Sequence, residues 1–253
     1  MVVVVQHRNT SKQLLRFRHN SNQENNSITT LAGFQTLRGL KWLNIEKINM
    51  QKREPLFLGH YYHIYNRGNN GQDVFLETEN YYYFLRLYAK FIEPIAETYA
   101  WCLLKNHFHF LIRIKDESEI NTNQLTYSTT EKPKIITPSK QFSHLFNAYT
   151  QAINKKHQRT GSLFEKNFER KLVSTEAYFQ QLIFYIHNNP VKHGFVDKMN
   201  LYPWSSFESV TSDKPTMIKR SEVLTIFGDK EGFLEYHSHQ QNTNAINDFI
   251  IEN

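Results

Sequence analysis

The middle of the chain alternates between apolar and polar residues with two different periods, and these periods predict its elements. Period-two patterns rich in β-forming residues predict strands at 61–67, 99–104 and 107–114, and a further strand within 162–173. Helical spacing predicts helices over 78–92 and 142–157, and a third from Ser174 or Thr175 to about Asn188, where Pro190 ends it. A short helix is predicted from Ser221. The order strand, helix, strand, strand, helix, strand, helix predicts an α+β fold, with helices on one face of an antiparallel sheet.

Two segments fall outside this pattern. Residues 1–49 are rich in Asn, Gln, Ser and Thr and lack periodicity. They are therefore predicted to be a disordered tail, or to reflect a start site assigned too early, with Met50 as the true initiator. Residues 116–140 are polar and contain two prolines, which predicts an insertion loop. The main domain is then 50–210, and 211–253 form a C-terminal extension.

Charge changes this picture only locally. The net charge is +6, but residues 1–49 carry seven basic side chains against two acidic ones, so the rest of the chain is almost neutral. Residues 151–174 hold six basic side chains against two acidic ones. This segment is either an ordinary solvated face or a surface that follows a nucleic-acid backbone. The candidate contacts are Lys155, Lys156, Arg159, Arg170 and Lys171.

Several classes of protein are excluded or disfavoured by composition. Cys102 is the only cysteine, so the chain can form no internal disulfide and no four-cysteine zinc site. No apolar run approaches the roughly 20 residues that span a bilayer. We therefore expect a cytoplasmic protein without membrane contact.

Candidate chemistry begins with His107 and His109. Residues two apart on a strand project to the same face, so both imidazoles share one face while Phe108 and Phe110 enter the core. Two adjacent imidazoles form half of a site for a divalent metal ion. The alternative is a half-exposed strand that carries two polar side chains. His237 and His239 have the same spacing, but they lie near an unpatterned terminus.

A second candidate group is Tyr185 with Asn189, four residues apart on one helix face. A tyrosine hydroxyl can attack a phosphodiester and form a covalent phosphotyrosine. Asn189 offers a carbonyl oxygen as a third metal ligand. In the alternative interpretation, Tyr185 is a core residue and Asn189 caps the helix. Tyr149, on an earlier helix, is the second candidate for the nucleophile.

Five segments in the same order resemble the REP-associated tyrosine transposases, part of the wider HUH group of single-strand transposases. They are 63–68 (HIYNRG), 101–111 (WCLLKNHFHFL), 161–165 (GSLFE), 185–194 (YIHNNPVKHG) and 202–206 (YPWSS). The resemblance covers about residues 55–210, and the five motifs together are more specific than any one of them. Lys105 stands where the family has a proline before the asparagine, and Asn106 keeps the asparagine.

The resemblance implies a ferredoxin-like α+β nuclease domain of the HUH type. His107 and His109 would hold a divalent metal, Mg or Mn, and Asn189 would complete the metal site. Tyr185 would form a 5′-phosphotyrosine bond with single-stranded or hairpin DNA. Members include monomers and dimers, so a homodimer stays open.

Other functions and other contacts remain open. The same fold can bind a DNA hairpin or RNA as a regulator without cutting it. Tyr61, Tyr62, Phe164 or Trp204 could stack unpaired bases, or they could pack in the core. His187 could transfer a proton, or it could face solvent.

Overall fold

The computed structural model describes residues 35–37, 40–42, 55–120, 137–165 and 167–239. Within the segment 1–49, the described residues form two short antiparallel strands, β1 (Gln35–Leu37) and β2 (Leu40–Trp42). The rest of that segment, Met50, most of the 116–140 loop and the end of the C-terminal extension lie outside the described residues. The predictions made for those parts therefore stay predictions.

The main sheet has four antiparallel strands. They are β3 (Tyr61–Arg67), β4 (Ala96–Leu103), β5 (His107–Ile114) and β6 (Glu169–Leu172), in the order β4-β5-β3-β6. Helix α1 (Thr78–Phe91) connects β3 to β4, and α2 (Pro138–Lys156) connects β5 to β6. This is the βαββαβ order of a ferredoxin-like fold. The predicted fold class is therefore confirmed.

One face of the sheet packs against α1 and α2. Helix α1 begins at the predicted residue, Thr78, after a capping box between Glu77 and Asn80. Helix α2 begins four residues before the predicted start, with a proline at its first turn. Their apolar stripes meet Phe108 and Phe110 of β5, and together they form the first hydrophobic core.

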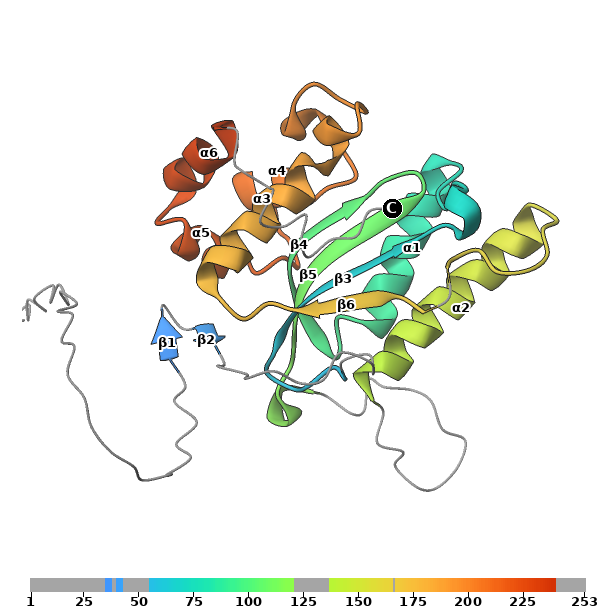
Figure 1. Cartoon of the computed structure of the whole chain (residues 1–253), viewed down its shortest axis with the longest axis horizontal. Helices are drawn as coiled ribbons and strands as arrows, with labels where there is room; N and C mark the ends of the chain where they lie inside the picture. Colours follow the sequence, from blue (N-terminus) through green and yellow to red (C-terminus); the bar gives the residue numbers. More distant parts are fainter. Residues whose placement is uncertain (1–34, 38–39, 43–54, 121–136, 166, 240–253) are drawn as a thin grey trace, which may run out of the picture. The chain divides into compact units, whose positions relative to one another are not determined.

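The opposite face of the sheet packs against helix α3 (Glu176–Lys192), so the prediction that helices cover only one face is wrong. Figure 1 shows α1 and α2 on one side and α3 on the other. The central strands are buried on both faces, and that leaves little of the alternation that would mark a solvent-facing side. Thr175 caps α3 by accepting a hydrogen bond from the Tyr178 N–H at 3.1 Å.

The described part of the predicted C-terminal extension takes part in this second core. After η4 (Met199–Leu201), the chain forms α4 (Phe207–Thr211), α5 (Arg220–Ile226) and α6 (Lys230–Ser238). Helix α5 starts one residue before the predicted Ser221, and Val223 and Phe233 are buried beside α3. No helix among the described residues is long and apolar enough to cross a membrane.

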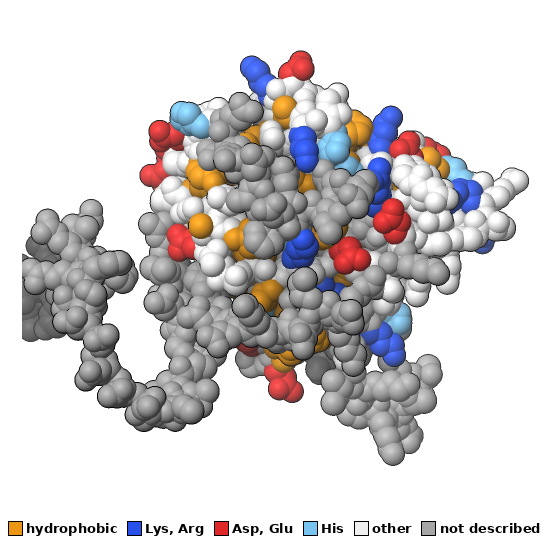
Figure 2. All heavy atoms as spheres, viewed as in Figure 1, with side chains coloured by type: hydrophobic (Ala, Val, Ile, Leu, Met, Phe, Trp, Pro, Cys, Tyr) orange, Lys and Arg blue, Asp and Glu red, His pale blue; other side chains and the backbone are white. Residues whose placement is uncertain are grey.

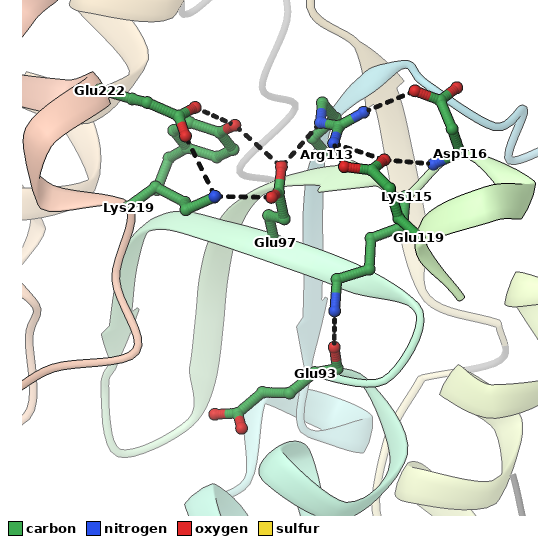
Figure 3. Close-up of polar contacts among 9 residues, drawn as sticks. Glu93, Glu97, Arg113, Lys115, Asp116, Glu119, Lys219 and Glu222 are labelled. Carbon is green, nitrogen blue, oxygen red and sulfur yellow. Dashed lines mark hydrogen bonds and ion pairs between the residues drawn. The ribbon is translucent and has the colours of Figure 1, made fainter. Parts of the chain in front are cut away.

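An ion-pair network fastens α5 to the end of the sheet (Figure 3). Arg113 on β5 donates to Glu97, Asp116 and Glu119 at 2.7, 3.1 and 2.7 Å. Lys219, at the start of α5, contacts the same Glu97 at 2.7 Å. Burial alone would raise the pKa of Glu97, but the hydrogen bonds from Arg113 and Lys219 bring it below its usual value. The network therefore stays ionised near neutral pH, and it ties α5, which packs in the second core, to β4 and β5.

Candidate active site

The predicted histidine pair lies on the face of the sheet that α3 covers. The register pairs Tyr65 with His109 and Arg67 with His107 across β3 and β5, so these side chains share one face. The rings of His107 and His109 lie 5.2 Å apart between centroids, at an angle of 83°. Phe108 and Phe110 point into the first core, as the alternation predicts.

Both rings are held by side chains of the sheet and its turn. His107 is half-buried, and its Nδ1 lies 2.6 Å from Asn106 Oδ1. His109 is buried, and its Nδ1 lies 3.0 Å from Nε2 of His63 on β3. The pKa of His109 is well below its ordinary value, first because of burial and then because of nearby His63, His107, His193 and Lys192. His109 is therefore neutral near pH 7, which is the form that can bind a metal ion.

Tyr185 on α3 packs against His109, one of the two predicted histidines. Its ring centroid lies 5.4 Å from that of His109, at 82°, and 6.3 Å from that of His63. The Lys192 Nζ, two turns later on the same helix, lies 5.4 Å from the centre of the Tyr185 ring. The Tyr185 side chain is only 2% exposed and belongs to the second core. Tyr185 is thus both a core residue and a neighbour of the predicted metal ligands.

Asn189 lies one turn after Tyr185 and is fully buried. Its Nδ2 donates to the Tyr185 carbonyl at 3.0 Å, while its Oδ1 accepts no hydrogen bond from the described residues. The prediction that Pro190 ends the helix is wrong, because α3 continues to Lys192 with Pro190 inside it. Asn189 therefore does not cap the helix terminus. Its bond back to the carbonyl of Tyr185 is a type of side-chain contact that accompanies local bending of a helix.

These donors are chemically suited to a divalent metal ion. Imidazole nitrogen suits borderline divalent ions, and the amide oxygen suits the harder Mn²⁺ or Mg²⁺, so this mixed set fits Mn²⁺ better than Mg²⁺. The buried Asn189 Oδ1, an acceptor without a donor among the described residues, fits that role, because leaving such an atom unsatisfied is costly. No group of three or more His, Cys, Asp or Glu side chains in the described part of the chain could hold a metal. A third protein ligand would then come from another residue type, and Asn189 stays the predicted one.

Tyr149, the second candidate for the nucleophile, lies on the other face of the sheet. It is fully buried in the first core, and its hydroxyl donates to the Val74 carbonyl at 2.9 Å. Burial, the main cause, raises its pKa far above the ordinary value. The sheet separates Tyr149 from both histidines. The alternative prediction that Tyr149 is the nucleophile beside them is therefore wrong.

The five predicted nucleic-acid contacts do not form one patch. Lys155, Lys156 and Arg159 lie at the end of α2, where Lys156 pairs with Glu77 at 2.6 Å. Arg170 donates to Ser139 at the start of α2, roughly 25 Å away along the helix. Lys171 points to the opposite face, in register with His63. On the face seen in Figure 2, Lys and Arg side chains are likewise spread among other types.

The structure adds site residues that the sequence reasoning missed. His63 and Tyr65 lie on the histidine face, and the Tyr65 ring lies 5.9 Å from that of His109. Burial and then Glu169 raise the pKa of Tyr65 to about 12. The His193 ring lies 5.1 Å from that of His107. His63 and Tyr65 have the same two-residue spacing as His107 and His109, and that spacing was the available signal.

The proposed base-stacking residues are mostly internal. Tyr61, Tyr62 and Phe164 are buried in the two cores. Trp204 is half-buried and stacks on Tyr81 at 4.4 Å. Of the four, Trp204 alone has an exposed portion that a base could contact.

His187 belongs to a buried chain of hydrogen bonds and does not face solvent. Its Nε2 lies 2.8 Å from Ser206 Oγ, and its Nδ1 lies 3.2 Å from Nε2 of His237 on α6. The His237 Nδ1 lies 2.8 Å from the Phe233 carbonyl, which can only accept a hydrogen bond. Each imidazole is therefore neutral, donating through Nδ1 and accepting through Nε2. These hydrogen bonds join α3 to α6.

We expect this chain of hydrogen bonds to make the fold sensitive to acid. Burial lowers the pKa of His237 to about 4 and that of His187 well below its usual value. As pH falls, the two histidines are protonated in the unfolded chain before they are protonated in the folded one. Their contribution to the free energy of unfolding is therefore complete above about pH 6.5 and is lost as pH falls toward 4. The loss from His237 is on the order of 3 kcal/mol.

Urea unfolding at pH 7 and pH 4.5 would measure this loss. The matched variant is His237→Gln, which can make both hydrogen bonds but cannot titrate. We expect the variant to lose less stability between the two pH values than the wild-type protein does. An equal loss in both proteins would contradict the assignment.

Comparison with known proteins finds a sequence relative and a solved structure of similar fold. Over 113 residues, 44% of this chain, the sequence is 27% identical to a Haemophilus influenzae protein named "Putative REP-associated tyrosine transposase". The match spans 58% of that protein's length. No family model matches the chain. A solved structure described as "Structure of the REP associates tyrosine transposase bound to a REP hairpin" has a TM-score of 0.48 and 16% identity, over 66% of this chain and 89% of that one. By its sequence, this chain is therefore similar to a protein that is named as a REP-associated tyrosine transposase.

Proposed function

We propose that the protein is a metal-dependent enzyme that cuts and rejoins single-stranded DNA near hairpins through a 5′-phosphotyrosine intermediate. The observation that carries this proposal is the contact between Tyr185 and His109, on the sheet face that also presents His107. The sequence relative, named as a tyrosine transposase, supports the same reaction class.

The residues of this site have separate roles in the proposed reaction. His107, His109 and Asn189 Oδ1 would hold Mg²⁺ or Mn²⁺. When bound, the ion polarises a phosphate oxygen and offsets the charge that develops on it. The Lys192 ammonium lies 5.4 Å from the centre of the Tyr185 ring and adds a further positive charge near the phenol. Together these groups favour negative charge where the phenol meets the phosphate.

The bond changes balance without a nucleotide cofactor. The Tyr185 oxygen loses its proton and forms a bond to phosphorus, while the bond from phosphorus to the 3′ oxygen breaks and that oxygen takes up a proton. The phosphodiester is conserved in the protein–DNA bond, so an incoming 3′-hydroxyl can reverse the step and join strands. Because Tyr185 is 2% exposed, a DNA phosphate reaches it only after a rearrangement that opens a path to the hydroxyl.

Basic side chains on two parts of the surface would contact the DNA backbone. Lys171 lies on the histidine face beside His63, where it could meet the strand that enters the site. Lys155, Lys156 and Arg159 lie at the end of α2 and could meet a more distant part of the hairpin. Contacts of this kind make binding weaker as salt concentration rises.

The burial of Tyr185 favours one alternative, a regulator that binds hairpin DNA or RNA without cutting it. A labelled single-stranded DNA hairpin, incubated with the protein and Mn²⁺, Mg²⁺ or EDTA, separates the two functions. The enzyme gives a covalent protein–DNA adduct on a denaturing gel with metal and none with EDTA. A regulator gives a chelator-insensitive shift on a native gel and no adduct. An adduct of equal yield in EDTA would contradict metal dependence.

A further inference from the structure

The two imidazoles of the predicted metal site are held through the same ring atom, Nδ1. In each ring, Nδ1 is within hydrogen-bond distance of a neighbouring side chain: Asn106 Oδ1 for His107, at 2.6 Å, and His63 Nε2 for His109, at 3.0 Å. The Asn106 Nδ2 donates to the Gly71 carbonyl at 3.4 Å, which turns Oδ1 toward His107. The His107 Nδ1 must therefore be the donor, and its lone pair is on Nε2.

His109 can likewise carry its proton on either Nδ1 or Nε2, and the hydrogen bond with His63 decides between these two tautomers. If His109 Nδ1–H donates to His63, then His109 Nε2 carries a lone pair and can bind a metal. If His63 Nε2–H donates instead, then His109 Nε2 carries a proton and cannot. A neighbour that fixes the tautomer and the ring orientation of a metal-binding histidine is a common device in metal sites.

The position of His63 suits it for orienting His109, and not for binding the metal directly. It lies on β3 two residues before Tyr65, which pairs with His109, so it is a diagonal neighbour of His109 on the same face. It is fully buried, and its ring plane is within 23° of that of His109, as expected for an in-plane N–H···N bond. Among the described residues, His63 does not join His107 and His109 in a group that could hold a metal.

We propose that His63 is a positioning residue that accepts a hydrogen bond from His109 Nδ1–H and so leaves His109 Nε2 as the metal-binding atom. This inference rests on the proposed function, because it concerns the same metal site. Asn106 performs the equivalent task for His107. His63 does not touch the metal or the DNA in this arrangement, and it acts only through His109.

Metal affinity of the full chain without DNA tests the proposal. Mn²⁺ binding, followed by electron paramagnetic resonance of the free ion, would be measured for the wild-type protein, His63→Phe and His63→Gln. We expect His63→Phe to weaken binding about 10- to 100-fold, because it keeps a ring but removes the acceptor. His63→Gln should recover most of the affinity, since its amide oxygen can accept the same bond. His144→Phe, on α2 in the other layer, is the matched control and should bind as the wild type does.

Wild-type Mn²⁺ affinity in a folded His63→Phe protein would overturn the proposal, and so would an equal loss in His63→Gln. Thermal unfolding and hairpin binding in EDTA show whether each variant folds. If His63→Phe does not fold, nitrogen-15 NMR of the wild-type imidazoles decides. His109 protonated at Nδ1 supports the proposal, and His109 protonated at Nε2 overturns it.

Failure of the proposed function gives a different result from failure of this inference. If the wild-type protein binds no Mn²⁺, the proposed metal-dependent function is contradicted. The NMR spectrum of the metal-free protein then still shows which of the two histidines donates.

Discussion

A Tyr185→Phe variant is expected to lose covalent DNA capture completely while it keeps its fold and its affinity for a hairpin. The substitution removes only the phenolic oxygen, which is the atom that must bond to phosphorus. The ring that packs against His109 in the second core remains, so the stability cost should be no more than about 1.5 kcal/mol. The measurement is adduct formation with a labelled hairpin and Mn²⁺ on a denaturing gel, beside thermal unfolding.

Two other tyrosines provide matched controls for this prediction. Tyr65→Phe removes a hydroxyl on the same face of the sheet, where the ring lies 5.9 Å from that of His109. Tyr149→Phe removes one from the opposite core. Both should retain capture. If Tyr65→Phe abolished the adduct and Tyr185→Phe did not, the nucleophile would lie on β3 and not on α3.

A His107→Ala variant is expected to lose metal-dependent cleavage by a factor on the order of 100 or more, because half of the imidazole pair is removed. His107 is the better test of the pair, since it is half-buried at the start of β5 and its removal disturbs little packing. His109 is fully buried and contacts several rings, so its removal would mix a packing effect with a chemical one. Cleavage rates over a range of Mn²⁺ concentrations would measure the effect.

The control for His107→Ala is His144→Ala, on the helix layer that covers the other face. That variant should cleave at the wild-type rate. A His107→Ala protein that cuts at the same rate with EDTA as with Mn²⁺ would count against the ligand assignment. A reduced rate that recovers at high Mn²⁺ would support it, since weakened binding is overcome by concentration.

Local periodicity predicted several parts of the fold correctly. The run of β-forming residues over 107–114, which alternates at 107–110, gave the strand its observed bounds, because the apolar side chains of a strand must be buried in a core. The stripe that contains Leu145, Tyr149 and Ile153 predicted α2, although the helix begins earlier at Pro138. The separation of four residues between Tyr185 and Asn189 placed both on α3 one turn apart. In each case the determining interactions lie within a few residues of one another.

Periodicity failed wherever the answer depended on a partner distant in the sequence. An apolar stripe shows that a helix has a buried side but does not indicate which face of the sheet it covers, so the place of α3 opposite α1 and α2 was missed. The alignment of Tyr65 with His109 depends on strand register, which brings His63 to His109 across 46 positions of sequence. Five basic residues close in sequence lie at both ends of α2 and on both faces of β6 for the same reason.

The sequence by itself therefore determined the four main strands, the three longest helices and the paired imidazoles, because strand and helix patterns are set by neighbouring residues. Only the tertiary structure decided that Tyr185 meets His109, that His63 holds the second imidazole, and that Tyr149 lies on the wrong side of the sheet. Those outcomes follow from strand register and from the choice of sheet face, which are settled when both hydrophobic cores close around the sheet.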